Sequence, residues 1–213
     1  PMFADPALTQ FAAEHPDLAL RERFLDLPGV RLHVVEAGPA DGRPVLLLHG
    51  FPEFWWGWRH QIPALAAAGR RVVVPDLRGY NLSGKPEGIR AYGLDPLTDD
   101  LRGLLDDVGS QSGPEPIDVV AHDWGGAVAW NLANQLPHLA QRLMIVNSPH
   151  PGTFLRELKN NPEQQAASAY MNFLIRPDAE RLLAQDDYRR LWDFFSAPGQ
   201  TAVRQIEVED GIL

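Results

Sequence analysis

Three stretches of the chain place polar side chains where apolar runs stop, and these residues could do chemistry. They are "HGFPEFWWGW" from His49, "DLRGYNLSGKP" from Asp76 and "AHDWGG" from Ala121. In the third stretch a carboxylate, Asp123, stands in the order small–x–Asp–x–small–small. A carboxylate held at such a point can attack an electrophilic carbon and form an ester, which water then cleaves.

Asp123 is open to two interpretations. Small residues on both sides of a nucleophile permit the sharp turn from a strand into a helix, although the serine version of this motif begins with Gly and not with Ala121. Aspartate is also a favoured N-cap, and a helix is expected at about 124–136. The apolar run before Asp123 and the Trp-Gly-Gly after it favour the nucleophile.

The elements that must hold these stretches follow from the apolar pattern. Continuous apolar runs at 44–50, 70–76, 116–122 and 142–148 predict buried strands, and 24–36 predicts two strands around a Pro28–Gly29 turn. Helices are expected at about 55–68, 95–108 and 124–136, and a loop at 110–116. This alternation predicts an α/β fold with a mostly parallel sheet, helices on both faces and the active site at the carboxyl ends of the strands.

The pattern changes after residue 148. Residues 153–213 contain helical segments and no further apolar strand run, so we predict a core at 1–148 and a helical part at 149–213. That second part is either a separate helical layer or a lid inserted into the sheet domain.

Composition excludes several classes of function. The chain has 213 residues, a net charge of −9 and no cysteine, which excludes disulfides, thiolate metal sites and a cysteine nucleophile. Its basic residues are scattered, which argues against nucleic-acid binding. There is no apolar run near the ~20 residues of a membrane span, and the first 16 residues lack the pattern of a secretory signal. We therefore expect a cytoplasmic protein with no nucleic-acid or membrane partner.

Four stretches together carry a resemblance to a known family. "HGFPEFWWGWRHQI", "DLRGYNLSGKP", "HDWGG" and "NSPHP" resemble the α/β-hydrolase superfamily, and most specifically the epoxide hydrolases, from about residue 24 onwards. The resemblance implies that Asp123 is the nucleophile and that the amides of Phe51 and Trp124 form an oxyanion hole. It also implies a helical lid after the sixth strand, in which Tyr170 donates a proton to the epoxide oxygen, and no metal or cofactor.

Other residues of the motifs receive supporting roles. Pro52 and Trp55 are predicted to contact the substrate. We expect His49 to be a structural histidine hydrogen-bonded within its own loop, and Asp76 and Arg78 to fix their loop.

The activity implied by the resemblance is the opening of an epoxide to a vicinal diol through an aspartyl ester. Water would then cleave the ester after a histidine removes its proton. The family's histidine follows the last strand, and its acid partner usually follows the strand after the lid. The seven histidines of this chain lie elsewhere, at His15, His33, His49, His60, His122, His138 and His150.

We therefore expect this chain to be the N-terminal portion of the fold, truncated within the lid and without the C-terminal strands. The remainder of the same polypeptide, or a second chain, would carry the histidine, and the sheet would expose an edge and an apolar face. Two alternatives stay open: a haloalkane dehalogenase with the same Asp nucleophile, and a non-catalytic α/β-hydrolase fragment that acts as a binding module.

Overall fold

The structure is a computed structural model that describes residues 2–113 and 116–195. It divides into two compact units that meet between Pro151 and Gly152, close to the boundary predicted at residue 148. Residues 196–213 of the predicted helical part lie outside the described residues.

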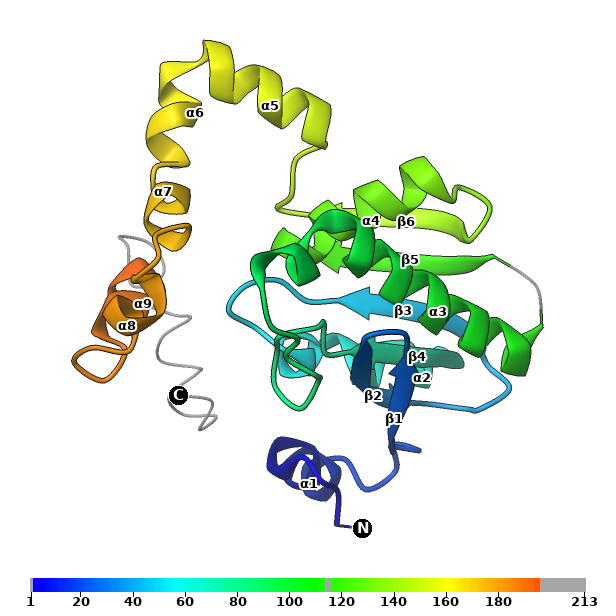
Figure 1. The fold of residues 1–213 in the computed structure, drawn as a ribbon. Helices are drawn as coiled ribbons and strands as arrows, with labels where there is room; N and C mark the ends of the chain where they lie inside the picture. Colours follow the sequence, from blue (N-terminus) through cyan, green and yellow to red (C-terminus); the bar gives the residue numbers. More distant parts are fainter. Residues whose placement is uncertain (1, 114–115, 196–213) are drawn as a thin grey trace. The chain divides into compact units, whose positions relative to one another are not determined.

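The first unit is built on a six-stranded sheet (Figure 1). The strands are β1 (Arg21–Leu27), β2 (Val30–Ala37), β3 (Arg43–Leu48), β4 (Arg70–Pro75), β5 (Ile117–His122) and β6 (Ala140–Val146), in the spatial order β1-β2-β4-β3-β5-β6. The strands β4, β3, β5 and β6 are parallel, whereas β1 and β2 form an antiparallel hairpin that joins the edge of β4. The mostly parallel sheet of the sequence prediction is therefore confirmed.

Helices cover both faces of this sheet. On one face, α3 (Leu94–Ser112) and α4 (Asp123–Gln135) pack on β3 and β5 around a common apolar core. The buried apolar residues of α3 recur mostly at three- and four-residue spacing: Leu97, Leu101, Leu104, Leu105 and Val108. Each fully buried leucine contributes about 2 kcal/mol of transfer free energy. On the other face, α2 (Gln61–Ala67) contacts β4 and buries Ile62 completely.

Two predicted boundaries differ from the structure. The helix predicted at 55–68 is instead a short 3₁₀ helix, η1 (Trp55–Trp58), followed by α2. Pro63 explains the break, because it has no N–H to donate and is tolerated only in the first turn of a helix. Part of the loop predicted at 110–116 is helical, because α3 continues to Ser112 and ends at Gly113, whose φ is +98°.

Two short elements lie outside the predicted ones. The helix α1 (Pro6–Glu14) precedes the sheet, and the Asp5 side chain caps it by accepting a hydrogen bond from the amide of Ala7. Its residues Leu8 and Phe11 are buried. A 3₁₀ helix, η2 (Ile89–Tyr92), leads into α3.

The outermost strand, β6, is covered on one side. Leu143 and Ile145 pack against the core shared with α4. Met144 and Val146 point to the opposite face and are 62% and 37% exposed. Among the described residues the sheet therefore ends in a strand that leaves apolar side chains open to solvent, as predicted for a sheet without its last strands.

Beyond β6 the described elements are all helical. They are α5 (Pro151–Asn160), α6 (Pro162–Ala167), α7 (Tyr170–Leu174), α8 (Ala179–Leu183) and α9 (Arg189–Phe195). Within residues 2–113 and 116–195, the helices are too short or too polar to cross a membrane.

Candidate active site

Asp123 lies at the turn between β5 and α4. His122 is extended, with φ −121° and ψ 143°, and Asp123 then adopts φ +49° before the helix continues. A positive φ is uncommon for a residue with a side chain, and such conformations concentrate at functional sites. The backbone thus makes the abrupt strand-to-helix turn that the motif predicts.

The glycines after Asp123 permit close approach of α4 to its neighbours. A Cβ added at Gly125 would lie 2.4 Å from the carbonyl oxygen of His49, and one at Gly126 would lie 2.4 Å from Cβ of Ser148. Neither position has room for a larger residue without a shift of the surrounding backbone or side chain. Close packing around the turn therefore explains why the motif ends in two small residues, Gly125 and Gly126.

The carboxylate of Asp123 meets the loop after β3. The backbone amide of Phe51 donates a hydrogen bond to Oδ1 of Asp123 over 2.9 Å. The N-cap of α4 is His122, and no side chain caps the helix there, so Asp123 is not the N-cap that the alternative interpretation required. Trp124 is the second residue of α4, where backbone amides have no partner within the helix. The structure therefore brings Asp123 and Phe51 together at a helix N-terminus.

His49 fixes the start of this loop. Its ring is fully buried, Nδ1 lies 2.9 Å from the carbonyl oxygen of Gly50, and Nε2 accepts a hydrogen bond from the amide of Leu77 over 2.9 Å. Burial lowers the pKa of His49, so the ring is neutral, with its proton on Nδ1. Both nitrogens are engaged, as expected for a structural histidine.

Asp76 and Arg78 fix the adjoining loop, as predicted. Oδ1 of Asp76 accepts a hydrogen bond from the amide of Trp55 over 2.9 Å. Arg78 forms a two-fold contact with the carboxylate of Asp100, with both nitrogen–oxygen distances at 2.6 Å. The two loops at the carboxyl ends of β3 and β4 are thus held to each other and to α3.

Glu53 and His122 form an ion pair that the sequence interpretation did not include. Nδ1 of His122 lies 3.1 Å from Oε2 of Glu53. The hydrogen bond to Glu53 raises the pKa of His122. Burial works against the charge of Glu53, but the hydrogen bond from His122 and its charge hold the pKa of Glu53 below its usual value. Each residue lies within two positions of a predicted site residue, and this adjacency was the only available signal.

Tyr80 is a second residue that the sequence interpretation missed. Its ring packs edge-on against His49, with 4.8 Å between ring centroids. Burial and the negative charge of Asp123 both raise the pKa of Tyr80, so its phenol is neutral.

Trp55 is placed differently from the expectation. Its side chain is fully buried, and the indole Nε1 donates a hydrogen bond to Oδ2 of Asp5 over 2.8 Å. Phe11 of α1 packs edge-on against the same ring at 5.7 Å. Because α1 covers Trp55, this side chain belongs to the interior and not to an open pocket wall. Pro52 is exposed and follows Phe51 through a cis peptide bond.

Tyr170 lies in the second unit. It is the first residue of α7, and its side chain is 41% exposed. Its role in proton donation stays a prediction.

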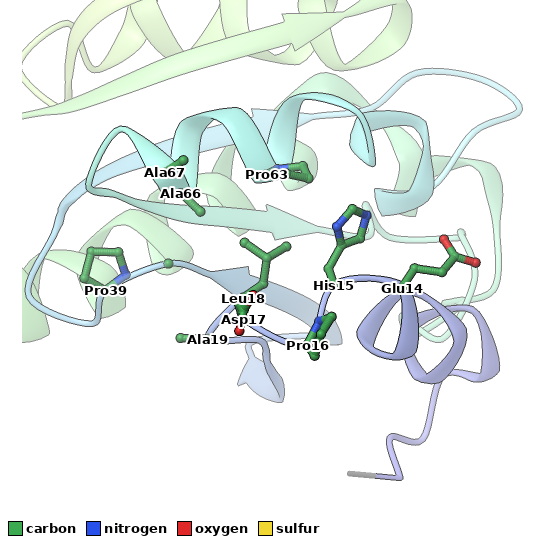
Figure 2. Close-up of a pocket in the computed structure, with 11 residues that line it drawn as sticks. Glu14, His15, Pro16, Asp17, Leu18, Ala19, Pro39, Pro63, Ala66 and Ala67 are labelled. Carbon is green, nitrogen blue, oxygen red and sulfur yellow. The ribbon is translucent and has the colours of Figure 1, made fainter.

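A cavity of about 560 Å³ lies apart from the predicted site residues (Figure 2). It is lined by the segment that follows α1, by Gly38 and Pro39 after β2, and by α2.

Gly50 supplies a direct test of the geometry at Asp123. A Cβ added there would lie 2.4 Å from Cβ and 2.6 Å from Oδ1 of Asp123. Gly50→Ala is therefore expected to displace the carboxylate and to slow covalent modification of Asp123 by roughly 100-fold, since displacement by about 1 Å costs that much. Rapid-quench mass spectrometry with an aryl epoxide measures this rate.

Gly109→Ala is the matched control, because a Cβ at Gly109 in α3 meets no atom within 4 Å. We expect the control to react at the wild-type rate and to gain about 0.5–1 kcal/mol of helix stability. Equal rates for Gly50→Ala and Gly109→Ala would show that the loop does not position Asp123.

Comparison with known proteins identifies the family of this chain. Residues 43–189 match the family model described as the alpha/beta hydrolase fold. The AB hydrolase superfamily protein YfhM of Bacillus subtilis is 46% identical over 170 residues, which are 79% of this chain and 58% of that protein. Epoxide hydrolase A of Mycobacterium tuberculosis is 56% identical over 110 residues, 52% of this chain and 33% of that protein.

Solved structures show the same likeness. A mutant epoxide hydrolase from Bacillus megaterium superposes with a TM-score of 0.75 at 37% identity, covering 83% of this chain and 60% of that one. Another mutant of an epoxide hydrolase from Bacillus megaterium, complexed with its product (R)-3-[1]naphthyloxy-propane-1,2-diol, gives a TM-score of 0.74 with the same identity and coverage.

The matches do not extend over the whole of these relatives, since the chain spans 58%, 41% and 33% of the first three curated ones. The family model nevertheless covers more than half of the chain. The chain belongs to the α/β-hydrolase fold family.

Proposed function

We propose that the protein containing this chain opens epoxides to vicinal diols through an ester on Asp123. The observation that carries the proposal is the Asp123 carboxylate, held at a positive φ with Oδ1 bonded to the amide of Phe51. The epoxide hydrolases among its relatives support the choice of substrate class.

The first step of the proposed reaction forms the ester. Oδ2 of Asp123 attacks one ring carbon of the epoxide from the side opposite the ring oxygen, and the bond between that carbon and the oxygen breaks. Oδ1 stays bonded to the amide of Phe51. The ring oxygen leaves as a developing alkoxide and takes a proton from a phenol, which we assign to Tyr170.

The second step cleaves the ester. Water, deprotonated by a histidine, adds to the ester carbon and places negative charge on Oδ1. The amides of Phe51 and Trp124 stabilise that charge as an oxyanion hole. Collapse of the intermediate breaks the bond between the ester carbon and the alkyl oxygen, which takes the proton held by the histidine and leaves as the diol. The acid proton of Asp123 returns to the Tyr170 phenolate, which restores the carboxylate and the phenol. A serine at this position would form an ether, which has no carbonyl for water to attack.

The histidine of the second step is assigned to the remainder of the polypeptide or to a second chain. His49 is neutral with both ring nitrogens engaged, and Nδ1 of His122 is paired with Glu53. The proposal also keeps residues 149–213 as the incomplete helical lid predicted from the sequence. A cytoplasmic location stays a prediction, for which the absence of cysteine fits a reducing compartment.

Oxygen-18 labelling tests the ester mechanism in the full-length protein. The probe is 1-naphthyl glycidyl ether, whose hydrolysis yields a diol like the product of the Bacillus megaterium relative. In a single turnover in ¹⁸O-water, the label is expected in the Asp123 carboxylate and not in the diol. Label that enters the diol in that first turnover would exclude the ester and indicate direct attack by water.

Two further arms of this experiment separate the alternatives. Tyr170→Phe is expected to slow ester formation by roughly 10²–10⁴-fold, the usual contribution of a positioned acid. Halide release from a haloalkane, without diol formation from the epoxide, would favour the dehalogenase. Absence of both turnover and adduct would favour the binding module.

A further inference from the structure

His33 belongs to a buried cluster of ionisable side chains that the proposed reaction does not use. It consists of Asp5 before α1, Glu22 on β1, His33 on β2 and Asp76 after β4. The side chains of His33 and Asp76 are fully buried, that of Glu22 is 10% exposed, and Asp5 is 3% exposed. Groups of this kind are costly to bury unless they are paired and hydrogen-bonded.

Both ring nitrogens of His33 face carboxylates. Nδ1 lies 2.6 Å from Oδ2 of Asp76, and Nε2 lies 3.0 Å from Oε1 of Glu22. An ionised carboxylate only accepts hydrogen bonds, and a neutral imidazole donates from only one nitrogen. Both contacts are therefore hydrogen bonds only if His33 carries a proton on each nitrogen.

The other partners of the cluster keep the proton on the imidazole. The backbone amides of Ala4 and Asp5 donate hydrogen bonds to the side-chain carboxylate of Glu22 over 2.6 and 2.8 Å. Burial by itself would lower the pKa of His33, but the hydrogen bond to Asp76 and its charge, the hydrogen bond to Glu22 and the charge of Asp5 raise it above its usual value.

The remaining side chains in contact with the cluster are neutral, and the ammonium of Lys85 lies next to them, where it donates to the backbone carbonyl oxygens of Asn81 and Ser83. The side-chain amide of Asn81 donates hydrogen bonds to Oδ2 of Asp5 and to Oδ2 of Asp76, each over 2.8 Å. The hydroxyl oxygen of Ser83 accepts a hydrogen bond from the backbone amide of His33, and the ring of Phe24 packs against the imidazole at 5.2 Å. The His33 ring thus lies between the carboxyl groups of Asp76 and Glu22, and Asn81 links Asp5 to Asp76.

This cluster holds one end of the loop that carries Phe51. Asp76 accepts a hydrogen bond from the backbone amide of Trp55, and Asp5 accepts one from the indole of the same residue. The other end of the loop is held by His49. Phe51 lies between these two anchors, and its amide bonds the Asp123 carboxylate.

We propose that His33, protonated at neutral pH, is a positioning residue that holds Asp5, Glu22 and Asp76 together and so fixes the Trp55 end of the Phe51 loop. Asp5, His33 and Asp76 could place ligand atoms within 4.8 Å of one another, but a metal ion there would displace hydrogen bonds that are already formed. A second proton on the His33 ring allows hydrogen bonds to both Asp76 and Glu22 without displacing any existing hydrogen bond.

The stability contributed by protonated His33 depends on pH in a definite direction. The pKa of His33 is higher in the folded protein than in the unfolded chain. The contribution of His33 to stability is therefore fully present at pH values below its pKa in the unfolded chain. It is lost as the pH rises through its pKa in the folded protein. The Phe51 loop should loosen on the alkaline side.

Two measurements on the full-length protein test the proposal without relying on turnover. In ¹⁵N-histidine NMR, the His33 ring is expected to show two bonded protons at neutral pH, with the resonance assigned by its loss in His33→Gln. A ring with a single N–H proton at neutral pH would overturn the proposal.

Hydrogen exchange tests positioning. In His33→Gln, the amides of Phe51 and Trp55 are expected to exchange roughly tenfold faster, because hydrogen bonds to a charged group are lost. Amides of β5 should keep their rates, and the exposed-site control His138→Gln should match wild type throughout. Equal acceleration in β5 and in the loop would mean a general loss of stability, and no acceleration in the loop would exclude positioning.

A pH series on the wild-type protein tests the proposal even if the His33→Gln variant does not fold. Raising the pH from neutral to alkaline should increase loop exchange relative to β5 exchange, and a constant ratio would contradict the proposal. The catalytic consequence rests on the proposed function: His33→Gln should lower kcat more than it changes KM. If the NMR and exchange results hold while the protein hydrolyses no epoxide, the positioning role stands and the proposed function fails.

Discussion

Asp123→Asn is expected to abolish diol formation, lowering kcat by at least about 10⁴-fold, as removal of a covalent nucleophile does in other enzymes. The asparagine side chain has nearly the same shape, and its amide oxygen can still accept the hydrogen bond from Phe51 that the carboxylate accepts over 2.9 Å. What is lost is the negative charge that attacks the epoxide carbon. Steady-state turnover of 1-naphthyl glycidyl ether measures the effect, and intact mass should show no adduct.

Asp95→Asn is the matched control for this change. Asp95 lies in the first turn of α3, as Asp123 does in the first turn of α4, and it is exposed. Its carboxylate accepts a hydrogen bond from the side-chain amide of Gln135. We expect wild-type turnover for this control. Retained turnover in Asp123→Asn, after mass spectrometry has excluded deamidation back to aspartate, would refute the assignment of the nucleophile.

Asp100→Ala is expected to cost about 3–5 kcal/mol of unfolding free energy, the usual result of leaving one charge of a buried pair without its partner. The guanidinium of Arg78 donates twice to Asp100 over 2.6 Å, and the side chains are only 6% and 4% exposed. Arg78 also donates to the carbonyl oxygen of Ala91. Removing the carboxylate leaves the guanidinium buried with that one neutral acceptor. Urea denaturation of the full-length protein measures the loss.

Two controls distinguish an unpaired charge from a simple loss of contacts. Asp99→Ala removes the partner of Arg102 in a pair whose side chains are 66% and 52% exposed, and should cost less than about 1 kcal/mol. The double change Arg78→Met with Asp100→Leu should recover much of the stability, because apolar side chains of similar volume often replace a buried pair without loss. An Asp100→Ala cost no greater than that of Asp99→Ala would contradict the prediction.

The sequence alone determined the alternation of strands and helices and the turn at Asp123. Apolar runs such as 44–50 and 116–122 stand out because strands buried on both faces need no polar residue within them. The pair Gly125–Gly126 marks the elbow because only small residues fit where a helix packs directly on a strand. These signals are local, so they can be found without knowing what lies across the fold.

Tertiary structure decided which interpretation of each residue holds. Whether Asp123 caps its helix or faces another loop depends on Phe51, which lies 72 positions away in the sequence. Trp55 is buried under α1, and nothing in the residues around Trp55 signals that helix. Long-range contacts of this kind leave no periodic pattern in either stretch.

The cluster around His33 and the pair of Glu53 with His122 also depend on long-range contacts, so the sequence did not predict them. Each of these residues by itself is an ordinary polar residue. Glu53 lies 69 positions from His122, and Asp76 lies 43 positions from His33. The chemistry of a histidine is set by which charges the fold brings to its two nitrogens. The sequence thus predicted which residue would form the ester, whereas only the folded chain brings the amide of Phe51 to that carboxylate.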